Sequence, residues 1–147
     1  MRMRHGLVLL LLLWLPFPLL AQGFDLAERG RQLGLDDPLA FATTVEHVCR
    51  DRRLPDRYVT KEEARRLGWE PGQDLCRVAP GRAIGGDRFA NRERLLPEAP
   101  GRVWYEADLD YACGPRGPRR LVFSSDGLVF VSVDHYRSFC LVPCPQP

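Results

Sequence analysis

The chain has 147 residues, of which 45% are hydrophobic, 10% aromatic and 27% charged. This length and composition fit a single globular domain and exclude an intrinsically disordered protein. The 21 basic residues are Lys61 and twenty arginines, against 19 acidic residues, so the net charge is +2. Arg2 and Arg4 lie in a segment that we expect to be removed, which leaves a net charge of zero. Bulk positive charge therefore cannot be what binds a nucleic acid, and an anionic substrate requires local clusters of arginine.

Residues 1–21 have the pattern of a secretory signal peptide. A basic start precedes residues 6–20, an apolar stretch of 15 residues. A membrane-spanning helix needs roughly 20 residues, so an uncleaved membrane anchor is the less favoured alternative. Cleavage can follow either of the small residues Ala21 and Gly23. We expect a secreted protein with no membrane attachment once the signal is removed.

The chain contains five cysteines, which we expect to form disulfides in an oxidising compartment. Because five is odd, at least one thiol stays free or pairs between chains. A zinc site built from His135 and the last three cysteines is an alternative, but a CxxxC spacing is a weak signal and the prolines beside it suggest an extended tail. The five are Cys49, Cys76, Cys113, Cys140 and Cys144.

The first half of the chain is predicted to be helical. Residues 22–40 are interpreted as an N-terminal extension with no clear packing partner. Asp37 followed by Pro38 predicts a helix start, and the apolar residues that follow recur every three or four positions. A second helix is predicted to begin at a capping box in residues 60–63 and to end at Gly68.

The second half is predicted to form strands. Residues 103–111 alternate between an apolar face for the core and a polar face left open to solvent. Residues 119–125 continue the alternation, and residues 128–133 form a third strand after the Asp126-Gly127 hairpin turn. Helices followed by antiparallel strands predict an α+β fold.

Two residues of the strand region are candidates for acid–base chemistry. Glu106 lies in the middle of the first strand on its polar face, and His135 follows the third strand. A carboxylate and a histidine on one open sheet face can act as general base and general acid. Polar sheet faces also carry carboxylates for solubility alone. His47, on the first helix, is interpreted as structural or solvated.

Cations gather near the same face. Residues 114–120 form an arginine-rich turn, and Arg120 has the phase of the polar face. Two arginines opposite the strand carboxylates would make a phosphate-sized positive site, although a solvated turn paired with acids is the alternative. Lys61 lies in the first turn of its helix, where a cation is electrostatically unfavourable. Its position indicates either that the charge is needed at this place or that the residue is a surface lysine without a specific role.

Six short motifs follow one another along the chain. They are LPDRYVTK (54–61), VAPG (78–81), IGGDRFANRE (84–93), WYEAD (104–108), SSD (124–126) and DHY (134–136). Together they closely resemble the barnase-type microbial ribonucleases, from about residue 41 to residue 142. The resemblance predicts a ribonuclease domain at residues 41–142, preceded by the extension and followed by a proline-rich tail at residues 143–147.

The resemblance implies a twisted antiparallel sheet with N-terminal helices packed on one face. It also implies guanine-preferring cleavage of single-stranded RNA with no metal or other cofactor. Glu106 would be the general base that takes the proton of the ribose 2′-hydroxyl. His135 would be the general acid that protonates the departing 5′-oxygen. The product is a 2′,3′-cyclic phosphate, which is hydrolysed with the two roles reversed.

The same resemblance assigns the surrounding charges. Lys61, Arg116 and Arg120 match the cations that stabilise the phosphoryl group in the transition state. Asp108 matches a carboxylate that orients the arginines. Asp87 matches one that neighbours the lysine.

Guanine recognition is assigned by resemblance to the loop after the first family strand. Glu93 would accept from the N–H edge of the base, and the amides of Asn91 and Arg92 would donate to its oxygen. Phe89 would either anchor this loop in the core or contact the base. Tyr136 would stack on or contact the substrate.

The family fold also brings Cys76 and Cys113 together, so the resemblance predicts a disulfide between them. Cys49 is expected to pair with Cys140 or Cys144, and the choice is open. A small acidic inhibitor protein resembling barstar is an expected partner. We expect a monomer, although the odd cysteine leaves a covalent dimer open.

Two functions follow from the sequence. The first is a secreted endoribonuclease that prefers guanosine. The alternative is a non-catalytic, disulfide-bonded module that keeps the fold and binds RNA or a protein. The presence of both proton-transfer residues favours the enzyme.

Overall fold

The computed structural model describes residues 25–145, so the predicted signal peptide and the last two residues of the predicted tail lie outside it. Helices and strands occur in the order α1 (Leu26–Gln32), α2 (Pro38–Asp51), β1 (Tyr58–Val59), α3 (Lys61–Arg66), the 3-10 helix η1 (Leu75–Arg77), β2 (Ala83–Phe89), β3 (Trp104–Asp108), β4 (Arg120–Ser124), β5 (Val129–Ser132) and β6 (Cys140–Leu141). The strands form one sheet in sequence order, antiparallel except for β1 and β2. Among these residues no helix has the length and apolar character needed to cross a membrane. The predicted α+β fold is confirmed.

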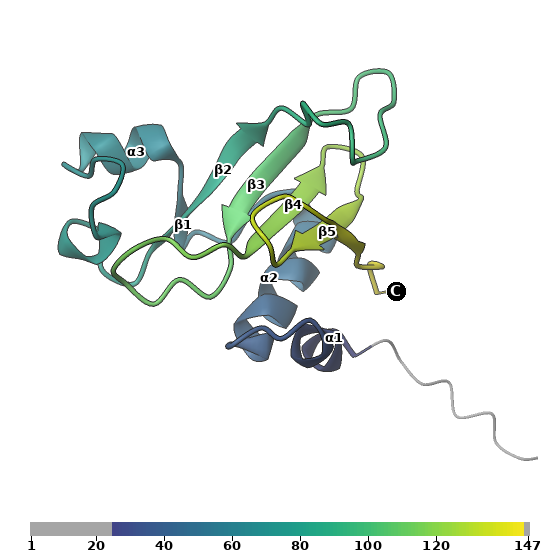
Figure 1. Cartoon of the computed structure of the whole chain (residues 1–147), viewed down its shortest axis with the longest axis horizontal. Helices are drawn as coiled ribbons and strands as arrows, with labels where there is room; N and C mark the ends of the chain where they lie inside the picture. The colour runs from purple at the N-terminus through teal and green to yellow at the C-terminus, as the bar shows by residue number, and fades with distance from the viewer. Residues whose placement is uncertain (1–24, 146–147) are drawn as a thin grey trace, which may run out of the picture.

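Helix α2 packs across one face of the sheet (Figure 1). The Asp37 carboxylate accepts a 2.9 Å hydrogen bond from the backbone N–H of Ala40, and Pro38 occupies the first helical turn, as predicted. The buried stripe of Phe41, Val45 and Val48 contacts the apolar side chains of β4 and β5. The helix therefore supplies the inner layer of the main core. The opposite face of the sheet carries a smaller cluster of Leu96, Trp104 and Val122 beside the polar residues of the strands.

The N-terminal segment differs from its interpretation as an extension without a partner. Residues Leu26 and Leu35 are buried in the same core as Phe41. The carboxylate of Asp110 accepts hydrogen bonds of 2.9 and 3.0 Å from the two backbone N–H groups before α2. The predicted boundary at residue 41 falls inside α2. The sequence did not reveal this because a seven-residue helix is too short to show an apolar period, and α1 is stabilised by packing on α2.

The cysteines form two disulfides among the described residues. Cys76 bonds to Cys113, which confirms the pairing implied by the resemblance, and Cys49 bonds to Cys144, which resolves the open choice. Cys140 is exposed and unpaired in this part of the chain. The alternative zinc set is wrong, because two of its cysteines lie in different disulfides. The predicted extended tail begins at residue 143, and the Cys49–Cys144 disulfide ties it to α2.

The alternation predicted for residues 103–111 is present, but the polar face is not open. Trp104, Glu106 and Asp108 are 3%, 8% and 2% exposed. The loop after β2 covers Trp104 through Leu96, and side chains from other segments cover the two carboxylates. A period of two identifies which residues share a face, but not what distant segments place over it. Glu106 and Asp108 therefore form the floor of a covered site.

Candidate active site

Glu106 lies at the centre of β3 and is held from two sides. Its Oε1 atom is 2.9 Å from Nζ of Lys61, and its Oε2 atom accepts a 2.5 Å hydrogen bond from the hydroxyl of Tyr136. Burial, together with the hydrogen bond to this carboxylate, raises the pKa of Tyr136 far above its ordinary value. The phenol is therefore neutral at physiological pH and acts as a donor. The carboxylate keeps a fixed orientation between an ammonium group and a hydroxyl group.

The start of α3 places Lys61 against this carboxylate. Thr60 and Glu63 form the predicted capping box, with a 2.7 Å bond from the Thr60 backbone N–H to Glu63. The backbone N–H of Lys61 donates to the carboxylate of Asp87 at 3.0 Å. Asp87 follows a register shift in β2, which directs its side chain to the helix start. Asp87 thus neighbours the lysine as predicted, through the backbone, and the contact with Glu106 offsets the cost of a cation at a helix N-terminus.

Asp108 organises the two arginines. Its oxygens accept hydrogen bonds of 2.7 Å from both Nε and Nη2 of Arg116, and one oxygen lies 3.2 Å from Nε of Arg120. These contacts raise the pKa of Arg116 above its ordinary value. Arg120 also donates to the hydroxyl of Tyr136 at 3.0 Å, so the arginine pair is joined to the Glu106 group. Lys61, Arg116 and Arg120 thus bring three fixed cations together around Glu106 and Asp108, and such a local cluster suits an anionic substrate.

A tight turn after β5 presents His135. The backbone of His135 and of Tyr136 is left-handed, with φ of 57° and 68°. Asp134 stabilises this turn, because its Oδ1 atom accepts from the backbone N–H groups of Arg137 and Ser138 at 3.1 and 3.0 Å. The His135 ring is exposed and its centroid lies 5.2 Å from that of Tyr136. Because Tyr136 contacts Glu106, the histidine and the carboxylate lie on the same side of the molecule.

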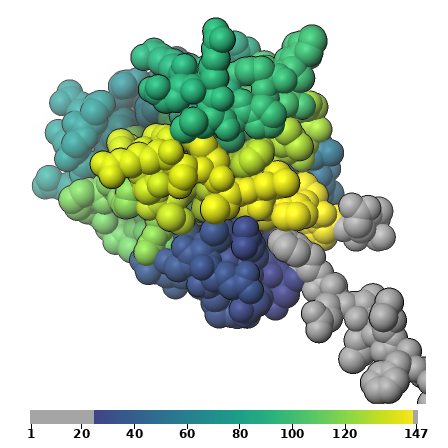
Figure 2. Space-filling view, turned by 45° about the vertical axis from the view of Figure 1, so that its right-hand side comes forward, coloured from purple at the N-terminus to yellow at the C-terminus, as the bar shows by residue number. Residues whose placement is uncertain are grey.

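A cavity of about 760 Å³ lies beside His135. One wall is residues 88–93 with Leu95, and the other is residues 135–137 with Phe139. Figure 2 shows the corresponding segments, green and yellow, next to each other on one surface. The cavity is open and partly aromatic, as expected for a site that receives a flat ring.

The predicted base-binding residues line this cavity. Phe89 is half-buried and stacks on Tyr136, with ring centroids 5.0 Å apart. Asn91 is buried with φ of 47°, and its side chain bonds both backbone groups of Leu96 at 3.0 and 3.1 Å. It therefore shapes the loop, and asparagine tolerates the left-handed geometry that this position requires. Arg92 and Glu93 are exposed, so their side chains are accessible to a ligand.

The sequence did not single out Asp134, although it belongs to the DHY motif. Its carboxylate accepts bonds from two hydroxyls and two backbone N–H groups within the turn. The hydrogen bond from the Ser138 hydroxyl is the main cause that lowers the pKa of Asp134 from 3.8 to about 2. An aspartate directly before a candidate catalytic histidine is the signal that could have identified it.

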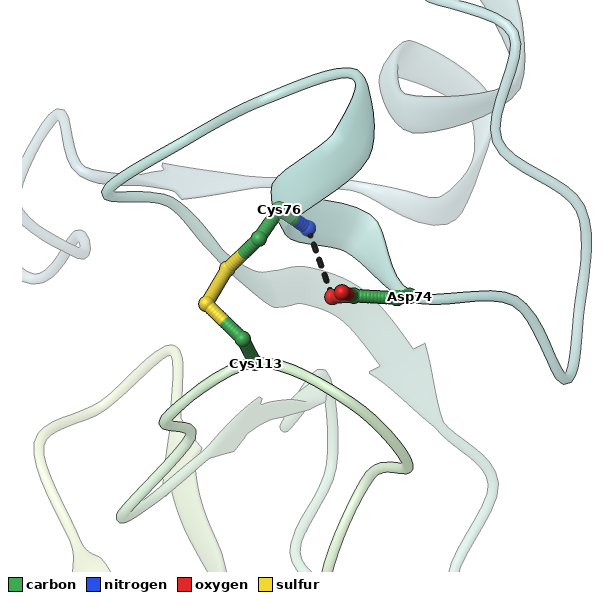
Figure 3. A group of neighbouring side chains, drawn as sticks. All are labelled: Asp74, Cys76 and Cys113. Atoms are coloured by element: carbon green, nitrogen blue, oxygen red, sulfur yellow. Dashed lines mark hydrogen bonds between the residues drawn. A yellow bond between two sulfur atoms is a disulfide. The ribbon is translucent and has the colours of Figure 1, made fainter.

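One further group has the composition of a metal site. Oxygen and sulfur atoms of Asp74, Cys76 and Cys113 lie within 4.8 Å of one another. Figure 3 shows that the two sulfurs are bonded to each other, while the Asp74 carboxylate accepts from the backbone N–H of Cys76 at 2.9 Å. A disulfide offers no thiolate ligand, so these residues are a cross-link in this structure.

The fold and the site together define a class of protein. A mostly antiparallel sheet carries helices on one face, and on the other a carboxylate, three cations and a histidine beside an open, partly aromatic cavity. This is the architecture implied by the resemblance to the microbial ribonucleases.

Comparisons with known proteins agree. The family model for ribonucleases matches residues 42–143. A ribonuclease of Heyndrickxia coagulans is 48% identical over 103 residues, which are 69% of this chain and 94% of that protein. Ribonucleases of Bacillus intermedius and Bacillus pumilus are each 49% identical over 100 residues, 67% of this chain and 62% of theirs. The match thus spans less than two thirds of the latter two proteins. The chain belongs to the ribonuclease family, a family of RNA-cleaving enzymes.

Proposed function

We propose that this chain is a secreted endoribonuclease that cleaves single-stranded RNA on the 3′ side of guanosine without a metal. Family membership supports the RNA-cleaving activity. The observation that carries the proposed mechanism is the position of Glu106, held between Lys61 and Tyr136 on the same side as His135. A fixed carboxylate and an accessible imidazole are the two groups that acid–base catalysis requires.

In the proposed first step, Glu106 takes the proton of the ribose 2′-hydroxyl, and the oxygen attacks the adjacent phosphorus. His135 protonates the 5′-oxygen as its bond to phosphorus breaks, which gives a 2′,3′-cyclic phosphate. In the second step, His135 takes a proton from a water molecule whose oxygen attacks the phosphorus. Glu106 returns a proton to the 2′-oxygen as its bond to phosphorus breaks, which leaves a 3′-phosphate. Lys61 and the two arginines held by Asp108 stabilise the charge that grows on the phosphoryl oxygens.

The proposed guanine site is the cavity beside His135. The exposed Glu93 carboxylate would accept from the N–H edge of the base, and the backbone amides of Asn91 and Arg92 would donate to its oxygen. The stacked pair of Phe89 and Tyr136 supports the proposal, because it gives the cavity an aromatic wall. Base–aromatic stacking contributes on the order of 1–3 kcal/mol per base.

Secretion and the inhibitor are part of the same proposal. Two disulfides suit a protein that works in an oxidising compartment, and the apolar stretch at residues 6–20 supports an exported precursor. A secreted ribonuclease endangers the cell that makes it. We therefore expect a small acidic protein that covers the site, with the protein itself a monomer.

The test is cleavage of GpN dinucleotides by residues 22–147, compared with Glu106→Ala and His135→Ala. Each variant should lose on the order of 10²-fold or more in rate with its fold unchanged by circular dichroism. Glu46→Ala and His47→Ala, on α2, are matched controls that should keep full activity. DNA should not be cut, since it lacks the 2′-hydroxyl. RNA binding without turnover would overturn the proposal and favour the binding module. Full activity in both active-site variants would contradict the catalytic roles assigned to Glu106 and His135.

A further inference from the structure

We propose that the Cys76–Cys113 disulfide and the hydroxyl of Tyr111 are a positioning device for the reaction. They fix the loop that carries Arg116, so that its guanidinium stands where the phosphoryl group gains charge. This inference rests on the proposed function, because it assigns a role in that reaction to residues that lie outside the active site.

The loop at issue is residues 109–119, between β3 and β4. It closes at its base through a 3.1 Å hydrogen bond from the backbone N–H of Leu109 to the carbonyl of Arg119. Arg116 stands near its middle, three residues after Cys113. Most residues from 112 to 118 are exposed, and none of them belongs to a hydrophobic cluster. An exposed segment without packing of its own samples many conformations, so residues 112–118 depend on cross-links to restrict them.

Two cross-links attach the loop to η1. One is the disulfide, which joins the exposed Cys113 to Cys76 (Figure 3). The other is the Tyr111 hydroxyl, which accepts from the backbone N–H of Leu75 at 3.0 Å and donates to the carboxylate of Asp74 at 2.9 Å. Leu75 is 1% exposed, within a second core cluster. The loop is therefore fastened to a part of the molecule that is itself well packed.

The other side of the loop contacts the reacting groups. Arg116 forms its paired hydrogen bonds with Asp108, and Gly117 accepts from Nη1 of Arg120 at 2.6 Å. The carbonyl of Pro118 accepts from the backbone N–H of His135 at 3.1 Å. The loop thus lies between η1 and the active site. Release from η1 leaves Arg116 held only from the active-site side, by its two hydrogen bonds with Asp108 and by the contacts of Gly117 and Pro118. The loop can then shift toward or away from η1.

Small displacements at this position are costly to the rate. Electrostatic stabilisation of a transition state depends on donors that are already in place when charge develops. A misplacement of about 1 Å can reduce a rate on the order of 10²-fold. A loosened guanidinium still attracts the substrate, so the loss should appear in kcat rather than in KM.

The experiment compares two disulfides. All variants carry Cys140→Ser, so that no free thiol can exchange. Cys76→Ala/Cys113→Ala should lower kcat for a GpN substrate on the order of 10-fold, with KM changed less than about 2-fold. Cys49→Ala/Cys144→Ala is the matched control, because it removes a cross-link between α2 and the C-terminal segment. At a temperature where circular dichroism shows both folded, this control should keep kcat within about 2-fold.

A second arm shows whether the effect passes through Arg116. In an Arg116→Ala background, removal of the Cys76–Cys113 bond should change kcat less than about 2-fold, because the two changes act on one interaction. Equal losses of kcat for the two disulfides, or an undiminished loss in the Arg116→Ala background, overturn the inference.

Tyr111→Phe keeps the test decisive if the double cysteine variant does not fold. It retains the disulfide and the ring, loses both hydrogen bonds, and should lower kcat about 3-fold in the same Arg116-dependent way. An unchanged kcat in Tyr111→Phe then overturns the inference. A wild-type protein that does not cleave RNA contradicts the proposed function itself, so the two failures are distinct.

Discussion

The hydroxyl of Tyr136 lies 2.5 Å from Oε2 of Glu106 and accepts a hydrogen bond from Arg120 on its other side. One phenol therefore links the proposed general base to the cations that are proposed to stabilise the phosphoryl group. The ring of the same residue stacks on Phe89 at the edge of the proposed base site. Tyr136 thus has two separable parts. Its hydroxyl orients the carboxylate of Glu106, and its ring forms part of the cavity wall.

The first prediction separates these two parts. Tyr136→Phe keeps the ring and removes the donor to Glu106, so kcat on a GpN substrate should fall on the order of 10-fold while KM changes little. Steady-state kinetics measure both constants. Tyr105→Phe is the control, because its ring stacks on Phe123 on the core side of the sheet. A Tyr136→Phe enzyme with wild-type kcat would show that the hydroxyl does not orient Glu106 for proton transfer.

The second prediction concerns Asp108. Its side chain is 2% exposed and that of Arg120 is 5% exposed, so Asp108→Asn leaves a buried guanidinium without its counter-charge. Breaking a buried ion pair by removing one partner costs about 3 kcal/mol of unfolding free energy. Urea unfolding measures this loss, and kcat should fall as well, since both arginines lose their orientation. Asp126→Asn is the control, because its half-exposed carboxylate pairs with Arg102 far from these arginines. An equal loss of unfolding free energy in Asp108→Asn and Asp126→Asn would contradict this prediction.

The third prediction is a pH dependence of stability. Hydrogen bonds, first from the Ser138 hydroxyl, lower the pKa of Asp134 from 3.8 to about 2 in the folded protein. A carboxyl whose pKa is depressed by folding stabilises the native state above its ordinary pKa, and this contribution is lost as the pH falls through the folded value. The free energy of unfolding should therefore decline between pH 4 and pH 2.

Asp134→Asn should make this decline shallower, because the amide does not titrate, while the depressed pKa of Asp126 keeps part of the decline. The comparison is urea unfolding of both proteins at a series of pH values across that window. Asp56→Asn provides the reference, since its side chain is 97% exposed and should leave the slope as in the wild type. An unchanged slope in Asp134→Asn would mean that the turn bearing His135 is not stabilised by this carboxylate.

The fourth prediction tests the base site. Glu93→Gln removes the acceptor proposed for the N–H edge of guanine, so the ratio of kcat/KM for GpN over ApN should fall at least about 10-fold. The rate on ApN should stay the same, since the catalytic groups are untouched. Glu70→Gln, an exposed residue near α3, is the matched control. A preserved ratio would place guanine recognition elsewhere.

Much of the fold followed from local signals. The cap at Asp37, the capping box at residues 60–63 and the alternation in residues 103–111 each depend on neighbours a few positions apart, and the structure confirms all three elements. Helix α1 was missed because its order comes from packing on α2. The segment that joins the two helices is held by Asp110, 73 and 74 residues away from the backbone groups that it binds. Such contacts leave no period in the sequence.

The site was predictable in composition and only partly in geometry. The resemblance supplied the identities of Glu106, His135 and Lys61, and the Cys76–Cys113 pair. It did not supply the burial of the strand's polar face or the central place of Tyr136. Those features arise where the loop after β2, the start of α3 and the turn after β5 meet over β3.

The sequence by itself determined the class of fold, the family and the chemical types of the groups at the site, because residue identity and short-range spacing are written in the chain. Only the tertiary structure decided that Glu106 is clamped by Lys61 and Tyr136, residues 45 and 30 positions away, and that Cys49 pairs with Cys144 rather than Cys140. The physical reason is that a hydrogen bond or disulfide forms within a few ångströms, and the path of the whole chain sets which distant atoms come that close.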